Sequence, residues 1–515
     1  MNKATFRETL TRRVIDPDTR DRWITITYMI LACAMLLHHV YVTVYFPFPE
    51  NGAIPFRYPW VILAGVSILL GRMWKDPCSW MLLGLLLMKF LRIAIPMPEL
   101  ISETQAVYEI CIYAFFICYG AGRVLNRKDR KLFISLFCAV WTLAMVVYSC
   151  IGMYVVLTGA EVSNLGIRPF YLHPSENRLW PVYHPVEGGT LAAVSMAVLL
   201  VGFFLTERKW IRALYIPAAI LIFLLNVFCS SRTSYILMAM GIGAPVSMLL
   251  YELLLKWKKQ GKVFTLLRLG AAFAAFAVLT VVLLLAQMKA IPAYNTLKSR
   301  GAGMISAAMA EEPEEIPALT PPEETEEEAG AAPEETETAS EKDGEGAAVE
   351  LSTREFVTGE GADGFLTGRY EIWTTVKDAL EHYPIYVLIG QGVYDPMDHI
   401  NSFIREGNAL PEIYHFHSTF IQTLWESGVP GFLLFTVFFG IFAWNAFRLM
   451  RDRSLPLWQR ILPLPAALCW LADMVDCTGY CNWGKPPMTI LYLFTGLTIA
   501  IARENRKNNK GAAQA

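Results

Sequence analysis

The sequence predicts an all-α polytopic membrane protein with about twelve transmembrane helices. Of its 515 residues, 54% are hydrophobic and only 17% are charged. The apolar residues form blocks of about 18 to 25 residues, the length that crosses a bilayer, and the blocks are neither alternating nor amphipathic. A soluble enzyme would carry roughly 25% charged residues and would interrupt its apolar runs every few positions. The composition therefore predicts membrane lipids as partners and no nucleic acid.

Twelve blocks are predicted to span the membrane, and the second is the shortest. In order they lie near 24–46, 57–72, 77–98, 105–123, 132–157, 187–206, 212–229, 233–254, 264–288, 430–449, 458–477 and 487–503. The domain organisation that follows is a membrane domain of about nine helices (24–288), a long external loop (289–429), and a membrane domain of about three helices (430–503).

The positions of Lys and Arg predict that both termini face the cytoplasm. The first 23 residues contain six Lys or Arg but no signal-peptide pattern, so 1–23 reads as a retained cytoplasmic tail. With the N-terminus in the cytoplasm, most of the 44 Lys and Arg fall in segments on the cytoplasmic side, as the positive-inside rule requires. Several of them form clusters in the loops. They are NRKDRK (126–131), ERKW (207–210), KWKKQGK (256–262) and RLMRDR (448–453). An even number of spans places the tail 504–515 on that side as well.

The external loop has two parts of different composition. Residues 311–350 contain sixteen acidic residues and one lysine, with no aromatic residue, which is typical of disordered low-complexity sequence. This insert has a net charge of −15, so the rest of the chain carries +13 although the whole has −2. The insert is either a tether or cation-binding segment, or a tolerated insertion in a loop.

After the insert, apolar and aromatic residues recur at helical spacing. The stretch GFLTGRYEIWTTVKDALEHYP predicts an amphipathic helix near 366–383 on the outer surface, ended by Pro384. Gly390 and Gly392 then predict a turn.

Two arginines are predicted at the outer surface. Arg232 begins the eighth span in CSSRTSYIL, and Arg369 lies on the amphipathic helix. An arginine at such a depth either extends to the interface or binds an anion, and a surface arginine is often simply solvated. Two guanidinium groups at one interface would suit the phosphate oxygens of a membrane-embedded substrate.

The stretch HFHSTFIQTLWESGVPG (415–431) predicts a short polar helix followed by a break. Ser418, Gln422 and Glu426 recur at i, i+4 and i+8, and Gly428-Val429-Pro430-Gly431 interrupts the helix before the span. Broken helices at membrane depth occur where they line a cavity. His417 stands at the helix N-terminus, where the dipole disfavours imidazolium, so it is either a general base or an ordinary polar residue at a span end.

Several other signals leave alternatives open. His184, in YHPVE before the sixth span, either binds sugar or phosphate or belongs to a Pro-capped helix entry, and Cys477 and Cys481 either pair or remain free thiols. The sequence has no P-loop, no Ser-His-Asp order and no zinc-ligand spacing. The first external loop (47–56) has Glu50 as its only carboxylate, whereas metal-dependent lipid-phosphate transfer needs paired carboxylates. Chemistry without a metal or cofactor is therefore favoured.

Together these motifs resemble the O-antigen ligase and polymerase superfamily of bacterial membrane glycosyltransferases. The ligase signature is a His, then Asn, Ser or Gln, nine residues, and Gly-x-x-Gly, and it fits His417 through Gly431. SSRTSYILMAMG around Arg232 resembles the Ser-Arg span start of the family. GRYEIWTTVKDALEHYPIYVLIGQGVYDP around Arg369 resembles its Arg-x-x-x-Trp helix and Gly-x-Gly turn, so the resemblance covers about 184–450.

The resemblance implies an enzyme of the bacterial cytoplasmic (inner) membrane that moves a glycan from an undecaprenyl-pyrophosphate carrier to an acceptor hydroxyl. The acceptor would be a glycan, a lipid or a cell-wall component. By this resemblance His417 is the base, Arg232 and Arg369 bind the pyrophosphate, no metal is required, and the anomeric centre inverts. Gln422 and His184 are further candidates for substrate binding.

Other function classes stay open at this point. The superfamily includes ligases, polymerases and protein O-glycosylating enzymes with the same motifs, and the acidic insert is not part of its pattern. A lipid-linked glycan flippase would also have twelve spans, but it predicts charges in many spans and repeated halves, which this sequence lacks. A scaffold that anchors cell-wall polymer would not need His417.

Overall fold

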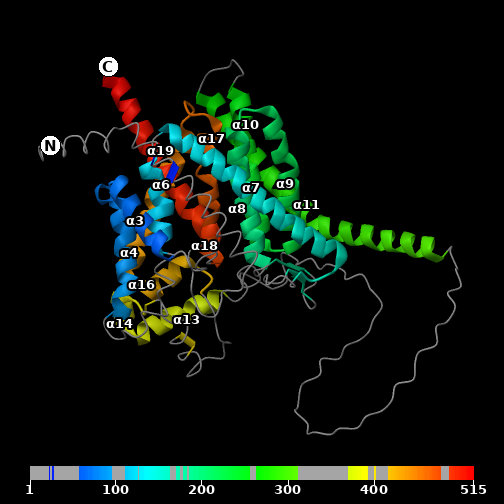
Figure 1. Ribbon diagram of the computed structural model, residues 1–515, viewed down its shortest axis with the longest axis horizontal. Coiled ribbons are helices and arrows are strands. Elements are labelled where there is room, and N and C mark those ends of the chain that lie inside the picture. Colours follow the sequence, from blue (N-terminus) through cyan, green and yellow to red (C-terminus); the bar gives the residue numbers. More distant parts are fainter. Residues whose placement is uncertain are drawn as a thin grey trace, which may run out of the picture.

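The structure, a computed structural model, is a helical bundle whose described residues include a two-stranded antiparallel sheet (Figure 1). It describes residues 23, 26–27, 57–94, 111–125, 127–162, 170–173, 178–181, 185–255, 262–310, 369–392, 400–401, 416–476 and 486–514. The predicted tail before residue 23, most of the first span and the acidic insert 311–350 lie outside these residues.

The described elements follow one another in this order: α3 (Arg57–Leu70), η1 (Met73–Lys75), α4 (Pro77–Ala94), η3 (Tyr113–Cys118), α6 (Tyr119–Val124), α7 (Arg127–Thr158), β1 (Tyr171–Leu172), β2 (Leu179–Trp180), α8 (Pro185–Leu205), α9 (Lys209–Cys229), α10 (Arg232–Leu255), α11 (Lys262–Ala310), α13 (Arg369–His382), α14 (Pro384–Ile389), α16 (Thr419–Arg451), α17 (Leu457–Ile461), α18 (Leu464–Asp476) and α19 (Pro486–Gln514). In the sheet, Tyr171 pairs with Trp180 and Leu172 with Leu179.

Six of the described helices are long and apolar enough to cross a membrane. They lie at Asp129–Thr158, Pro185–Leu205, Lys209–Cys229, Arg232–Leu254, Gly270–Thr296 and Thr419–Arg451. Each overlaps a predicted span, so the prediction of an all-α polytopic membrane protein is confirmed. The total of twelve and the orientation of the termini stay predictions. Two of the other six predicted spans illustrate why. The second span (57–72) corresponds to α3, which has only 14 residues, and the eleventh (458–477) is divided between α17 and α18.

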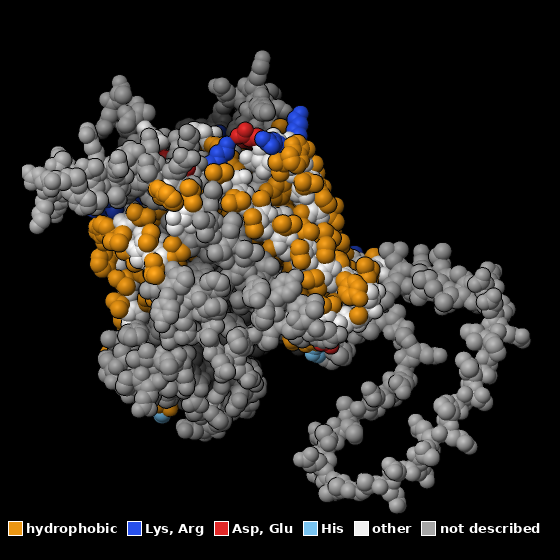
Figure 2. Space-filling model, in the orientation of Figure 1, with side chains coloured by type: hydrophobic (Ala, Val, Ile, Leu, Met, Phe, Trp, Pro, Cys, Tyr) orange, Lys and Arg blue, Asp and Glu red, His pale blue; other side chains and the backbone are white. Residues whose placement is uncertain are grey.

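The spanning helices differ in how deeply they are packed. Within its most apolar stretch, 83% of α8 is buried, against 11% of α11, so α8 is central and α11 peripheral. Large apolar side chains on outer faces stay exposed, for example Phe273 at 71% and Leu214 at 61%. Figure 2 shows such apolar side chains covering the visible sides of the bundle, with Lys, Arg and acidic side chains gathered at one edge. This distribution is that of a surface solvated by lipid.

A buried amide holds the central helices together. Asn226 on α9 donates from Nδ2 to the Gly189 carbonyl of α8 at 2.8 Å, and it accepts from Gln287 Nε2 of α11 at 3.1 Å. Gly189 also lets α10 approach closely, because a Cβ on Gly189 would be only 2.5 Å from the Ser234 hydroxyl oxygen of α10. Since a polar group in an apolar interior must be paired, these contacts fix how four helices meet.

Polar contacts define one end of the bundle. Arg453, just after α16, donates to Tyr251 Oη, and Arg460 pairs with Glu252. Tyr251 and Glu252 lie near the C-terminal end of α10, so α10 and α16 end together at one face, which we call the basic face. Both helices begin on the opposite side of the bundle, which we call the His417 face.

Two elements differ in length from the sequence prediction. The ninth span was expected to end at 288, but α11 continues to Ala310, because the residues beyond Pro292 are mostly good helix formers. The amphipathic helix expected near 366–383 is α13, Arg369–His382, and α14 begins directly afterwards at Pro384. Proline is favourable at that first helical position, because its missing N–H has no partner there in any helix.

At the basic face, Asp76 links the first helices to the last. It pairs with Arg503 of α19 and accepts a hydrogen bond from Tyr119 Oη at 2.6 Å. Burial alone would raise the pKa of the Asp76 carboxyl, but hydrogen bonds and the charge of Arg503 outweigh burial and hold the pKa below its ordinary value of 3.8. A carboxyl with a lowered pKa stabilises the fold above its unfolded-state pKa, and this contribution is lost as the pH falls through the folded-state value.

We expect Asp76→Asn to lower the melting temperature at pH 7, because Arg503 loses its anionic partner. The difference from the wild type should shrink below about pH 4, where the wild-type carboxyl takes up its proton. Thermal unfolding in detergent between pH 7 and pH 3 measures both effects. A melting-temperature difference that stays constant from pH 7 to pH 3 would contradict the proposal that ionised Asp76 stabilises the fold.

Candidate functional site

The break in α16 is the centre of the site. Gly428 has φ 62° and ψ −174°, a conformation open essentially only to glycine, and Pro430 follows it. In a regular helix, the carbonyls of Trp425 and Glu426 would accept from the N–H groups of residues 429 and 430. Proline has no N–H, so the break leaves backbone carbonyls that need other donors.

The turn after α14 supplies these donors. Gln391 N donates to the Trp425 carbonyl at 2.7 Å, and Gly392 N donates to the Glu426 carbonyl at 3.0 Å. Gly390, at φ 72°, lies so close that a Cβ on it would be 2.3 Å from the Glu426 carbonyl oxygen. The Gly-x-Gly turn and the Gly-x-x-Gly break, which the sequence predicted separately, are thus one structure.

We expect Gly390→Ala to destabilise the protein, because the methyl group displaces the backbone of α16 and the left-handed φ adds about 1–3 kcal/mol of strain. The melting temperature measures the loss. Gly440→Ala is the matched control, because Gly440 lies within α16 with nothing within 4 Å of an added Cβ. It should be neutral or stabilising by up to about 1 kcal/mol. Equal melting temperatures for the two variants would contradict the close approach.

A buried ion pair lies beside the break. Lys89 of α4 pairs with Glu426, and both side chains are almost completely buried. Gln422 Nε2 donates to the other carboxylate oxygen of Glu426 at 2.6 Å. The polar stripe predicted on this helix therefore faces the interior, where Lys89 compensates its charge. The sequence predicted the polar stripe that contains Gln422 and Glu426, but it did not predict that Glu426 pairs with Lys89.

His417 is held in an unusual backbone conformation at the start of α16. Its φ is 52°, and Ser418 follows as the N-cap of the helix. Left-handed backbone is uncommon for a residue other than glycine, although His is enriched in it, and it persists only where the surroundings impose it. Phe416, next to it, is fully buried, and its carbonyl accepts from Trp373 Nε1 of α13 at 2.8 Å. This bond fixes the segment that carries His417.

The same bond brings Arg369 to the site. Arg369 lies four residues before Trp373 on α13, and so it is on the same side of that helix. A small apolar cluster attaches α13 and α14 to α16. Its buried members are Val376, Ala379, Tyr386, Ile400, Phe416 and Trp425. The arginine is therefore positioned by rigid packing near the start of α16.

Arg232 lies at the His417 face, as the first residue of α10. The chain turns there through Ser230, which has φ 48° and ends α9, and Tyr235 Oη donates to the Val227 carbonyl at 2.8 Å to hold the turn. A further arginine, Arg178, is buried immediately before β2. The sequence analysis did not identify Arg178. The signal that could have identified it is a lone arginine directly before the apolar residues Leu179 and Trp180.

Three predicted features lie outside the described residues: His184, Cys477 and Cys481. Gln422 lies in the site, and its amide contacts Glu426. Within the part of the chain that the structure describes, no group of three or more His, Cys, Asp or Glu side chains is placed to hold a metal. Metal-independent chemistry stays a prediction from the sequence.

The fold and site define a polytopic helical membrane protein that presents a histidine and arginines at one face, beside a broken helix. Residues 217–436 match the family model described as O-Antigen ligase, a range that includes Arg232, Arg369, His417 and the break. This match supports the O-antigen ligase superfamily for that part of the chain. No curated protein matches the chain. Lys89, the partner of Glu426, precedes the matched range.

Proposed function

We propose that the protein is a glycosyltransferase that moves a glycan from an undecaprenyl-pyrophosphate carrier to an acceptor hydroxyl at the outer face of a bacterial cytoplasmic membrane. One observation carries the proposal: His417 is held at the start of the broken helix α16, hydrogen-bonded through its neighbour to the helix that bears Arg369. Arg232 begins α10 at the same face.

In this proposal His417 is the general base. A neutral imidazole can take the proton of the acceptor hydroxyl as its oxygen attacks the anomeric carbon. The bond between that carbon and the pyrophosphate oxygen breaks, and the leaving pyrophosphate keeps the electron pair. A single displacement of this kind inverts the anomeric centre.

The proposed role of Arg232 and Arg369 is to bind the pyrophosphate and to stabilise the charge that grows on it. Guanidinium groups bind phosphate oxygens in a bidentate way, and fixed positive charge near a departing anion lowers the barrier. Arg369 suits this role because α13 is packed rigidly on α16. Gln422 and His184 are proposed as further substrate contacts. Ligase and polymerase activities share this chemistry, so the proposal includes both.

The test follows the carrier. Purified full-length protein in lipid vesicles receives an undecaprenyl-pyrophosphate-linked oligosaccharide and a crude cell-envelope acceptor, and both released carrier and acceptor-linked glycan are measured. Equal amounts of the two support a transferase, and the size of the product distinguishes polymer growth from single transfer. Addition of EDTA should leave the rate unchanged. Movement of intact lipid-linked glycan across the bilayer without carrier release would contradict the proposal and identify a flippase.

A further inference from the structure

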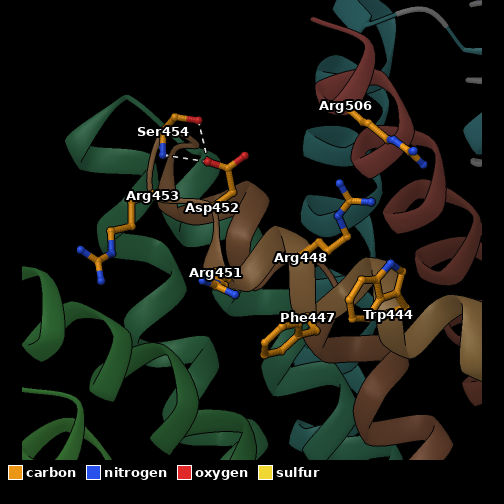
Figure 3. A pocket seen from close by; sticks show the side chains of 8 residues that line it. All are labelled: Trp444, Phe447, Arg448, Arg451, Asp452, Arg453, Ser454 and Arg506. Atoms are coloured by element: carbon orange, nitrogen blue, oxygen red, sulfur yellow. Dashed lines mark hydrogen bonds between the residues drawn. The ribbon is translucent and has the colours of Figure 1, made fainter. Parts of the chain in front are cut away.

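A basic hollow lies at the basic face, far along α16 from His417. Its volume is about 830 Å³. The residues that line it are Trp444, Phe447, Arg448, Arg451, Asp452, Arg453, Ser454 and Arg506 (Figure 3). Arg506 comes from α19, and most of the others come from the last turns of α16 and the loop after it. The lining thus contains four arginines and one carboxylate.

The carboxylate does not neutralise the arginines. Asp452 accepts hydrogen bonds from Ser454 Oγ at 2.6 Å and from Ser454 N at 3.1 Å, so it stabilises its own turn (Figure 3). Arg453 is directed at Tyr251, with its guanidinium 4.8 Å from the ring centre. Among the described residues, the guanidinium groups of Arg448, Arg451 and Arg506 form no ion pair. The hollow therefore carries net positive charge that can bind an anion.

Aromatic side chains mark the edge of the hollow as a membrane interface. Trp444 and Phe447 are 61% and 54% exposed, and their rings stack with centres 6.2 Å apart. Tryptophan is enriched at the level of lipid headgroups, where one side of the ring is apolar and the other is wet. Arginines next to such residues lie at the depth of lipid phosphates.

An apolar groove adjoins the basic hollow. It lies between α10, α11 and α16, has a volume of about 620 Å³, and shares Phe447, Arg451 and Arg453 with the hollow. The rest of its lining is mainly apolar and consists of Ser247, Met248, Tyr251, Ala272, Phe273, Phe276, Met450 and Arg460. Methionine and phenylalanine side chains adapt well to a flexible hydrocarbon chain. An anionic site and a chain-binding groove are thus continuous.

We propose that this pair of hollows binds one anionic phospholipid. The phosphate contacts Arg448, Arg451 and Arg506, and an acyl chain occupies the groove between α10, α11 and α16. Inorganic phosphate would use the arginines but leave the groove empty, and a lipid without net charge would leave the positive charge uncompensated. A basic cleft between helices on the cytoplasmic side, where the positive-inside pattern puts this face, is a setting that suits anionic headgroups.

The experiment measures lipid binding by the full-length, delipidated protein with native mass spectrometry. The probes are phosphatidylglycerol, phosphatidylcholine and inorganic phosphate. We expect phosphatidylglycerol to bind the wild type and the Arg448→Gln/Arg506→Gln variant to bind it about tenfold or more weakly, since each basic residue near an anionic headgroup contributes measurably. The matched control is Arg208→Gln/Lys209→Gln, which removes two exposed charges from the basic face outside the hollow. It should bind like the wild type.

Three results would overturn the proposal. They are wild-type affinity in the Arg448→Gln/Arg506→Gln variant, equal binding of phosphatidylcholine, and full displacement of phosphatidylglycerol by inorganic phosphate at matched concentration. The melting temperature of each variant is measured alongside, so that a change in binding is assigned to the site only where the fold is intact. The readout is independent of glycan transfer.

Discussion

His417→Asn is expected to lower the rate of carrier release by about 10²–10⁴-fold, the usual contribution of a positioned general base. Asparagine is the informative replacement because His417 has φ 52°, and asparagine tolerates left-handed backbone better than most residues. The backbone at the start of α16 should therefore persist while the imidazole is lost. Initial rates against donor concentration should show the loss in kcat, with the KM for the donor little changed, because the proposed pyrophosphate contacts remain.

Two controls separate a base from a residue that merely supports the fold. Added imidazole should restore part of the rate of His417→Asn, since a free base can enter the space that the side chain leaves. His382→Ala removes an exposed histidine from the last turn of α13 and should keep the wild-type rate. A wild-type rate of carrier release in His417→Asn would contradict the role of His417 and show that the base lies elsewhere.

Lys89→Ala is expected to destabilise the protein by about 3–5 kcal/mol, because it leaves the buried carboxylate of Glu426 without its partner. Glu426→Ala should cost a similar amount for the converse reason. The double variant Lys89→Met/Glu426→Gln should recover most of the loss, since it removes both charges and keeps an amide oxygen for Gln422. Melting temperatures of the wild type, Lys89→Met, Glu426→Gln and the double variant that combines these two substitutions form a double-mutant cycle that isolates the interaction.

The matched control is an exposed pair in the same region. Lys377 and Glu381 on α13 are 3.0 Å apart with both side chains about two-thirds exposed, so Lys377→Ala should change stability by less than about 1 kcal/mol. Single variants at 89 and 426 whose losses simply add in the double variant would show that the two residues do not interact. Because Glu426 adjoins the break at Gly428, loss of the pair should also reduce glycan transfer.

Some features of the candidate site could be predicted from the pattern of neighbouring residues in the sequence. The Gly-x-x-Gly motif predicted a break, and α16 breaks at Gly428, because the proline and the glycine act on the backbone within a few residues. The spacing of Ser418, Gln422 and Glu426 predicted one polar stripe, which follows from the helical repeat alone. Roles for His417, Arg232 and Arg369 were proposed from residue chemistry and resemblance, and the structure adds that Arg369 and His417 are connected through Trp373 and Phe416.

The sequence by itself determined that this chain is a helical membrane protein, because a bilayer demands about 20 apolar residues per span and satisfies backbone groups only within each helix. Tertiary structure alone decided which polar groups meet. Lys89 and Glu426 are separated by 337 residues, and the 390–392 turn donates to carbonyls more than thirty residues away. Such pairings depend on how helices pack against one another, and a pattern of neighbouring residues does not contain that information.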